Sequence, residues 1–256
     1  MSVITFMSDF GTTDHYVAAV KATIVRENPT QTIVDLTHNI RSYDIGHAAH
    51  VLKHVYHEFP LGTVHLIAVD SVKEKSKAIA TELEGHFFVG FDAGLLSLIS
   101  DQKPALVIDL LANGSVFPAK GVLARAAVKL AGGVQLDSLG ESFENYLELY
   151  PRQLKVTKRE ISGNVVAIDH YGNLITNIQK SDFEKIRELN GTDKIFTVRF
   201  GREAFTKIHQ YYTEVESGDC FIMFSSLGYL EIGINKGDAS ALLGLRVDAP
   251  VAIDFT

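Results

Sequence analysis

The feature that most constrains the fold is a change of hydrophobic pattern near the middle of the chain. In the first half, short apolar runs typical of strands alternate with segments of helical periodicity. These segments are residues 3–7, 16–26, 32–36, 45–59 and 64–69. The alternation predicts an α/β fold with a mostly parallel sheet that is covered by helices on both faces. Ligands of such sheets lie beyond the carboxyl ends of the strands, which is where Asp9 and Asp70 are expected.

The second half contains short apolar runs that are separated by turns, and only residues 182–189 show a clear helical pattern. The strands expected there are residues 165–168, 195–200, 219–223, 230–234 and 251–253. This pattern predicts a small antiparallel β domain, such as a β-barrel. We therefore expect an α/β domain over residues 1–150, a linker with Pro151 and several charges over 151–159, and the β domain over 160–256.

Charge and cysteine content argue against several classes of protein. The chain has 31 acidic and 24 basic side chains and no basic cluster, so nucleic acid is not an expected partner. The single cysteine, Cys220, excludes an internal disulfide framework, fits a reducing compartment, and is interpreted as a small core residue. The sequence lacks a signal-peptide pattern and the roughly 20 consecutive apolar residues of a membrane helix. We expect a cytoplasmic protein without a membrane partner.

The first motif with chemical meaning is SDFGTTDHY at residues 8–16. An aspartate that follows a strand, here Asp9, can accept two charge-assisted hydrogen bonds from a ribose diol. The second aspartate, Asp14, directly precedes the helix expected from Tyr16 and can cap it. From the residues alone, helix capping is the better interpretation of Asp14.

Two further motifs lie at expected turns of the second half. In DHYGNLITN, residues 169–177, the carboxylate of Asp169 can bind an ammonium, and the amide of Asn173 can pair with both edges of an adenine. The alternative is a hairpin turn, in which such residues are common. In SSLGYLEI, residues 225–232, hydroxyls and backbone N–H groups can hold a carboxylate, and the alternative is an ordinary turn.

In this order, the three motifs resemble the SAM hydroxide adenosyltransferase family, which is related to fluorinase and chlorinase; SAM is S-adenosyl-L-methionine. The segments DLTHNI at 35–40 and GLL at 94–96 are also similar to that family, and the resemblance extends over nearly the whole chain. It implies a Rossmann-like N-terminal domain, a C-terminal β-barrel and a homotrimer. It also implies that SAM, or adenosine, binds between the N-terminal domain of one subunit and the C-terminal domain of the next. SAM is then the substrate, and no cofactor is expected.

The resemblance assigns roles to three carboxylates. Asp9 matches the residue that binds the ribose hydroxyls. Asp14 and Asp169 match carboxylates near the methionine ammonium. Because an ammonium ligand explains both aspartates, this role is preferred over helix capping and a simple turn once the resemblance is considered.

Three more binding residues come from the second half of the chain. Asn173 matches an adenine contact, and Ser226 matches a residue at the methionine carboxylate. Tyr171 stands where the family usually has an aromatic residue. Together with the carboxylates, these residues imply a complete binding site for SAM.

The residues with which the family activates water match only in part. Hydrolytic members carry an aspartate, an arginine and a histidine for this step. Asp70 keeps the aspartate, whereas Ser76 and Pro118 stand where the arginine and the histidine are expected. Asp70 is our candidate for orienting the water or accepting its proton. Lys120 is a second catalytic candidate, for holding a hydroxide, and its alternative interpretation is a solvated charge at a helix start.

The resemblance thus implies hydrolysis of SAM to adenosine and L-methionine, by attack of water or hydroxide at C5′ of the ribose. A SAM- or adenosine-binding protein without turnover, such as a sensor, is the main alternative, and a halide in place of water is left open. A third possibility is a metal site formed by His47, His50, His54 and His57, whose spacing places them on one helix face. A solvated or subunit-facing polar surface is the preferred interpretation of that face, and no metal is expected.

Overall fold

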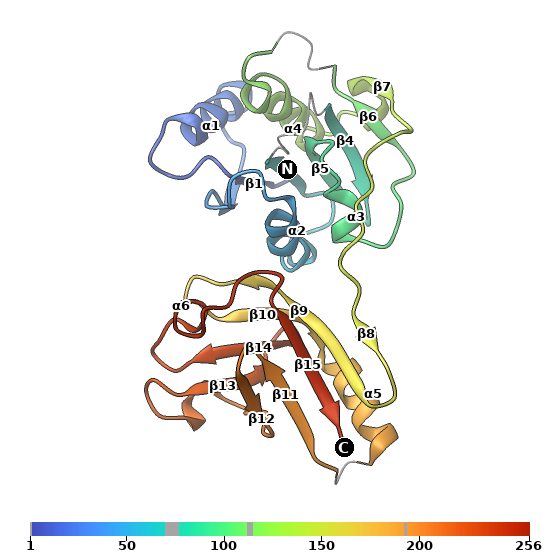
Figure 1. Ribbon diagram of the computed structural model, residues 1–256. Coiled ribbons are helices and arrows are strands. Elements are labelled where there is room, and N and C mark those ends of the chain that lie inside the picture. Colours follow the sequence, from blue (N-terminus) through green and yellow to red (C-terminus); the bar gives the residue numbers. More distant parts are fainter. Residues whose placement is uncertain (1, 70–76, 112–114, 192–193) are drawn as a thin grey trace. The chain divides into compact units, whose positions relative to one another are not determined.

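A computed structural model of the protein describes residues 2–69, 77–111, 115–191 and 194–256. The chain divides into two compact units, Met1–Pro151 and Arg152–Thr256, each with its own sheet (Figure 1). Within the described ranges, no helix is long and apolar enough to cross a membrane.

The described part of the first unit contains a seven-stranded mixed sheet with the order β2-β1-β3-β5-β4-β6-β7. The strands are β1 (Ile4–Ser8), β2 (Ile33–Thr37), β3 (Val64–Ala68), β4 (Ala78–Leu83), β5 (His86–Phe91), β6 (Val107–Asp109) and β7 (Glu141–Ser142). The pairings that join β2, β1, β3 and β5 are parallel, as expected. The pairings that involve β4, β6 and β7 are antiparallel, so the sheet is mixed rather than mostly parallel. One cause is the short turn at Glu84 and Gly85, because a connection of this length can join only antiparallel neighbours.

Helices cover both faces of this sheet, as the alternating pattern predicts. They are α1 (Tyr16–Glu27), α2 (Ile45–Lys53), η1 (Tyr56–Glu58), α3 (Leu96–Ile99), η2 (Ala119–Leu123), α4 (Ala124–Ala131) and η3 (Leu136–Leu139). Along β1, Ile4 and Phe6 pack with α1 and α4 in one apolar cluster, whereas Met7 packs with α2 and α3 in the other. This alternation follows from the two-residue period of a strand.

The helix expected over residues 45–59 is shorter in the structure. It ends at Lys53, and residues 56–58 form a separate 3₁₀ turn. Tyr56 is only 1% exposed, and its ring packs against His86 and Phe88. This core packing outweighs the helical preference of the segment.

The second unit contains a curled antiparallel sheet with the order β12-β11-β15-β9-β10-β14-β13 and β8 paired to β9 (Figure 1). Its strands are β8 (Lys155–Val156), β9 (Glu160–Ile168), β10 (Leu174–Gln179), β11 (Phe196–Phe200), β12 (Glu203–Phe205), β13 (Cys220–Phe224), β14 (Tyr229–Ile234) and β15 (Pro250–Phe255). The helices are α5 (Lys180–Asn190), η4 (Tyr212–Glu214) and α6 (Ala239–Leu243). The predicted antiparallel arrangement is therefore confirmed. The segment expected as a linker, residues 151–159, contains β8.

The core of the second unit forms because alternate residues of each strand are buried. On β9, every second side chain faces the core, and α5 covers it with Phe183 and Ile186. Cys220 packs against the same core, as predicted, and burial raises the pKa of its thiol to about 12. The pocket described below is formed by the hairpin turns and by strand faces that point away from this core.

Candidate functional site

A pocket of about 810 Å³ opens in the second unit, a volume in the range of small-molecule sites. Four segments form its walls: the β9–β10 turn, the β13–β14 hairpin, residues 235–238 after β14, and Tyr212 of η4. Tyr171, Asn173 and Ser226 all line it. The fold therefore brings together three predicted binding residues from two motifs that are far apart in the sequence.

Asp169 organises the β9–β10 turn on one side of this pocket. Its Oδ1 accepts the backbone N–H groups of Tyr171 and Asn173, both at 2.9 Å, and its Oδ2 accepts the Asn173 side-chain amide at 3.0 Å. Asp169 therefore stabilises a hairpin turn, which was the alternative to its role as an ammonium ligand. Because the amide nitrogen of Asn173 donates to Asp169, its orientation at the pocket wall is fixed.

Gly172 allows this turn to pack against the start of α6. Its φ is +84°, a conformation that favours glycine, and a Cβ at this position would lie 2.2 Å from Oδ1 of Asp238. The carbonyl oxygen of Gly172 accepts the backbone N–H of Ser240 at 2.9 Å. The tight approach joins two walls of the pocket.

The β13–β14 hairpin presents Ser226 at its tip. The turn is closed by two hydrogen bonds, from the backbone N–H of Ser225 to the Tyr229 carbonyl and from that of Gly228 to the Ser225 carbonyl, both 2.9 Å long. Ser226 is exposed and has no hydrogen bond to any residue that the structure describes. Its hydroxyl is therefore available to a ligand.

Glu231 lines the same pocket, although it has none of the roles that the motifs predict. On β14, its neighbours Leu230 and Ile232 are fully buried in the core, so Glu231 points to the opposite face. Burial raises the pKa of its carboxyl group, and the negative charge of Asp169 raises it further. A charged residue within the apolar strand YLEIGI was the signal that could have identified it.

In the first unit, Asp9 lies in the loop after β1 and is half-buried. Its Oδ2 accepts the backbone N–H of Tyr43 at 2.9 Å, which ties the loop to the turn before α2. Asp14 is exposed in the same loop. The N-cap of α1 is His15, without a side-chain cap, so the helix-capping interpretation of Asp14 is wrong.

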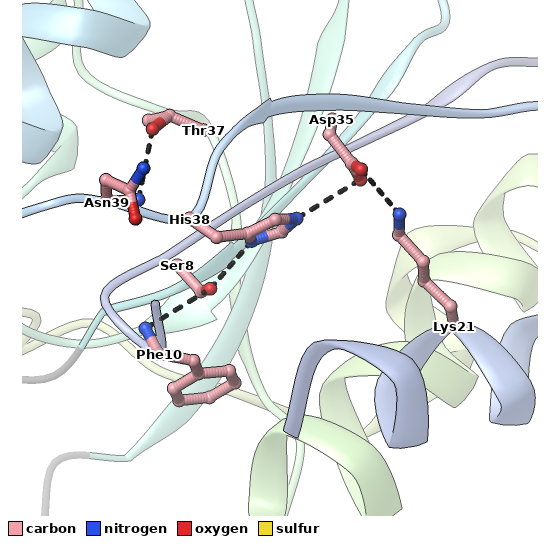
Figure 2. A network of polar contacts seen from close by, with 7 residues as sticks. All are labelled: Ser8, Phe10, Lys21, Asp35, Thr37, His38 and Asn39. Atoms are coloured by element: carbon pink, nitrogen blue, oxygen red, sulfur yellow. Dashed lines mark hydrogen bonds and ion pairs between the residues drawn. The ribbon is translucent and has the colours of Figure 1, made fainter. Parts of the chain in front are cut away.

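A chain of polar contacts supports the loop that carries Asp9 (Figure 2). The Ser8 hydroxyl lies 2.8 Å from Nδ1 of His38, whose Nε2 lies 3.2 Å from Oδ1 of Asp35, and Asp35 pairs with Lys21. The carbonyl of His38 also accepts the backbone N–H of Gly11 at 2.8 Å. A register shift in the β1–β2 pairing, after Phe6 and Asp35, precedes the turn at His38.

This network resembles the order of a nucleophilic serine, a base and an orienting carboxylate. However, Ser8 is completely buried and His38 is 6% exposed, so a substrate cannot reach the hydroxyl. Burial lowers the pKa of His38, and Asp35 opposes that shift. The network therefore positions the Asp9 loop and does not supply a nucleophile. His38 lies in the segment DLTHNI, whose sequence indicates a family resemblance but not this contact.

An aromatic cluster places the segment of Lys120 beside the same loop. The rings of Phe10, Tyr16 and Phe117 pack with centroid distances of 5.7 to 5.8 Å. Pro118 is the N-cap of η2, and Lys120 is exposed in the first turn of that helix. The structure thus brings the segment of the catalytic candidate Lys120 close to the loop of Asp9 and Asp14.

Asp70 and Ser76, the other two positions of the predicted water-activating set, lie outside the described residues. Their arrangement relative to Lys120 stays a prediction.

The four histidines of the proposed metal face do not share one helix, because α2 ends at Lys53 and His57 lies in η1. Two of them use a ring nitrogen locally: Nδ1 of His47 accepts the backbone N–H of Arg41 at 3.1 Å, and Nδ1 of His54 lies 2.6 Å from the His50 carbonyl. Burial, followed by nearby positive charges, lowers the pKa of His50 to about 4. Among the described residues, no three His, Cys, Asp or Glu side chains are grouped so that they could hold a metal ion.

Comparison with known proteins gives matches over most of the chain. The profile of the SAM hydroxide adenosyltransferase N-terminal domain matches residues 4–140, and that of the C-terminal domain matches residues 163–252. The (R)-S-adenosyl-L-methionine hydrolase of Methanocaldococcus jannaschii is 30% identical, with 96% of this chain and 93% of the relative covered. The hydrolase of the same name from Thermus thermophilus is 28% identical, with 99% and 100% covered. A solved structure of a Thermotoga maritima protein has a TM-score of 0.86 at 30% identity, with 98% of this chain and 100% of that chain covered.

Proposed function

Because this chain belongs to the SAM hydroxide adenosyltransferase family, we propose that it hydrolyses SAM to adenosine and L-methionine. The observation that carries the proposal is the convergence of Tyr171, Asn173 and Ser226 on one pocket. The names of the two similar hydrolases specify the R form of the substrate. Since L already describes the α-carbon, R describes the sulfonium, and the R epimer is the proposed substrate.

In the proposed binding mode, each part of SAM meets a group of matching chemistry. The Asn173 amide, fixed by Asp169, hydrogen-bonds the adenine, and the hydroxyl of Ser226 receives the methionine carboxylate. Asp9 binds the ribose hydroxyls. Its Oδ2 is already held by a backbone N–H, whereas its Oδ1 has no hydrogen bond from the described residues. Asp14 is exposed, so its carboxylate is accessible to the ammonium.

The chemistry follows from the leaving group. An oxygen of water or hydroxide forms a bond to C5′ while the C5′–S bond breaks, and the sulfur keeps the electron pair and leaves as a neutral thioether. No general acid or cofactor is required for this departure. Orientation and partial exclusion of water are the main tasks of the protein. Asp70 is proposed to orient the water or take its proton, and Lys120 is proposed to hold a hydroxide.

The proposal includes a homotrimer in which the site is completed by a neighbouring subunit. The family resemblance supports it, as do the large exposed side chains at the pocket, since Tyr171 is 76% and Tyr212 is 57% exposed. The Rossmann-like and β-barrel descriptions of the units rest on the same resemblance. So do the domain limits at residues 150 and 160. The proposed cytoplasmic location is supported by the single cysteine, which fits a reducing compartment.

The test is incubation with the R and S sulfonium epimers of SAM, with and without added chloride, followed by chromatography of the products. Equal amounts of adenosine and methionine above the uncatalysed rate, formed faster from the R epimer, are expected. A 5′-halogenated adenosine would identify the halide as the nucleophile. SAM binding without any adenosine above the uncatalysed rate would refute hydrolysis and leave a binding protein.

A further inference from the structure

Three carboxylates lie in or beside the pocket of the second unit, and two of them have local partners. Asp169 accepts three hydrogen bonds within its turn. Asp238 accepts the backbone N–H of Ala241 at 2.8 Å and caps α6. Glu231 differs from both, because its side chain makes no hydrogen bond or ion pair with any described residue. The pocket therefore contains a carboxylate that the described fold leaves without a partner.

This arrangement has an energetic cost in the ligand-free protein. Glu231 is half-buried on β14, between Ile175 of β10 and Met223 of β13, and apolar neighbours solvate a carboxylate poorly. The negative charge of Asp169 acts in the same direction. A cation that enters the pocket would remove this penalty by pairing with Glu231. The site is thus prepared for a positive charge.

The neighbouring wall indicates which cation fits. Ser225 and Ser226 line the same pocket, and a serine hydroxyl in a turn suits a carboxylate. In an α-amino acid, the ammonium and the carboxylate are attached to the same carbon, so a site for one has the other within reach. The sulfonium of SAM is farther from that carboxylate along the chain. The ammonium is therefore the better match for Glu231.

We propose that Glu231 is a specificity-determining residue that binds the α-ammonium of the amino-acid part of the ligand. The inference rests on the proposed function, because it takes an adenosyl amino acid as the ligand. It adds to the carboxylates of Asp14 and Asp169 a residue that lines the pocket directly. It also gives the pocket a reason to prefer adenosyl amino acids over plain nucleosides.

The test compares the wild-type protein with Glu231→Gln, a change that keeps the size of the side chain and removes its charge. Affinities are measured by calorimetry for four probes: SAM, S-adenosyl-L-homocysteine, 5′-methylthioadenosine and adenosine. S-adenosyl-L-homocysteine keeps the ammonium but has a neutral thioether in place of the sulfonium, and 5′-methylthioadenosine and adenosine have neither cation. We expect Glu231→Gln to lower the affinities for SAM and S-adenosyl-L-homocysteine by about 10- to 100-fold, the range for loss of a hydrogen bond to a charged group. The other two affinities should stay unchanged.

A matched control is Glu188→Gln, the same change on the exposed face of α5 outside the pocket. It should leave all four affinities unaltered. Equal weakening of all four probes by Glu231→Gln, or no weakening, would overturn the proposal. A lower affinity for SAM with an unchanged affinity for S-adenosyl-L-homocysteine would assign Glu231 to the sulfonium and overturn the ammonium assignment.

The same measurements separate this inference from the proposed hydrolysis. Binding of S-adenosyl-L-homocysteine involves no reaction, so the selective loss in Glu231→Gln can be observed even if the wild-type protein never releases adenosine. Conversely, hydrolysis by the wild-type protein together with an unselective Glu231→Gln variant would refute only the role of Glu231. Failure of the wild-type protein to bind any of the four probes would overturn both.

Discussion

Removal of the Asp169 carboxylate should loosen the β9–β10 turn and disturb the pocket. In Asp169→Ala, three donors lose their acceptor: the backbone N–H groups of Tyr171 and Asn173, and the Asn173 amide. A hydrogen bond to a charged group typically contributes about 1.5–3 kcal/mol. Water replaces much of this at Asp169 because the turn is half exposed, so we expect a total loss of about 2 kcal/mol. Chemical denaturation followed by circular dichroism measures the change in the free energy of unfolding.

Asp169→Asn separates the two roles of this side chain, which are to accept the backbone N–H groups of the turn and to hold the Asn173 amide. Its remaining oxygen can still accept the two backbone N–H groups, but its amide faces the Asn173 amide donor to donor. Stability should fall by about 1 kcal/mol or less, whereas adenosine affinity should fall because Asn173 is no longer held. Asp219→Asn is the control, since Asp219 is exposed and its side chain has no hydrogen bond among the described residues. Wild-type stability in Asp169→Ala, within about 0.5 kcal/mol, would refute this description of the turn.

Three further outcomes follow from particular contacts. Gly172→Ala should cost more than about 1 kcal/mol of unfolding free energy, because the added Cβ would meet Asp238 at 2.2 Å. Gly218→Ala, at a φ of +93° with nothing within 4 Å, measures the backbone penalty alone, and equal losses in both variants would exclude the clash. Glu231→Gln should stabilise the ligand-free protein at pH 8, because a raised carboxyl pKa means that ionisation is disfavoured in the folded state. The gain in unfolding free energy should vanish toward acidic pH, where the wild-type carboxyl group is also neutral. A variant that is less stable than the wild type at pH 8 would contradict the raised pKa. The neutral form of His50, with its pKa lowered to about 4, contributes stability that is lost as the pH falls below about 6.5 toward 4. The free energy of unfolding should therefore fall between pH 7.5 and pH 5, and this fall should be about 1–2 kcal/mol smaller in His50→Gln than in the wild type. An equal fall in both proteins would show that His50 is not its source.

Much of the fold could be predicted from hydrophobic periodicity, because period decides which faces are buried. The expected strands near Val64–Ala68 and Tyr229–Ile234 and the helix near Tyr16–Glu27 all form within a residue or two of their predicted limits. The direction of strand pairing was less predictable, because the hydrophobic pattern of a buried strand is the same in parallel and antiparallel sheets. Tertiary packing also overrode local pattern where Tyr56 enters the core and the helix over residues 45–59 ends early.

The site was less accessible from the sequence than the fold. Tyr171, Asn173 and Ser226 were identified by motif resemblance, and the pocket then groups them. The sequence marks Glu231 only as a charged residue within the apolar strand YLEIGI. That it lines the pocket without a counter-charge among the described residues depends on the tertiary structure. His38 was likewise hidden, since its contacts with Ser8 depend on how two neighbouring strands pair.

Hydrolysis at C5′ is tested most directly by tracing the oxygen of water into the product. SAM is incubated with the protein in ¹⁸O-labelled water, and adenosine and methionine are analysed by mass spectrometry. Attack at C5′ predicts adenosine that carries one ¹⁸O atom in its 5′ hydroxyl and methionine without label. Because Pro118 replaces the expected histidine, turnover should be slow, and Pro118→His should raise it by up to about 10²-fold if its imidazole reaches the water. Unlabelled adenosine, or none above the uncatalysed rate, would contradict the central claim.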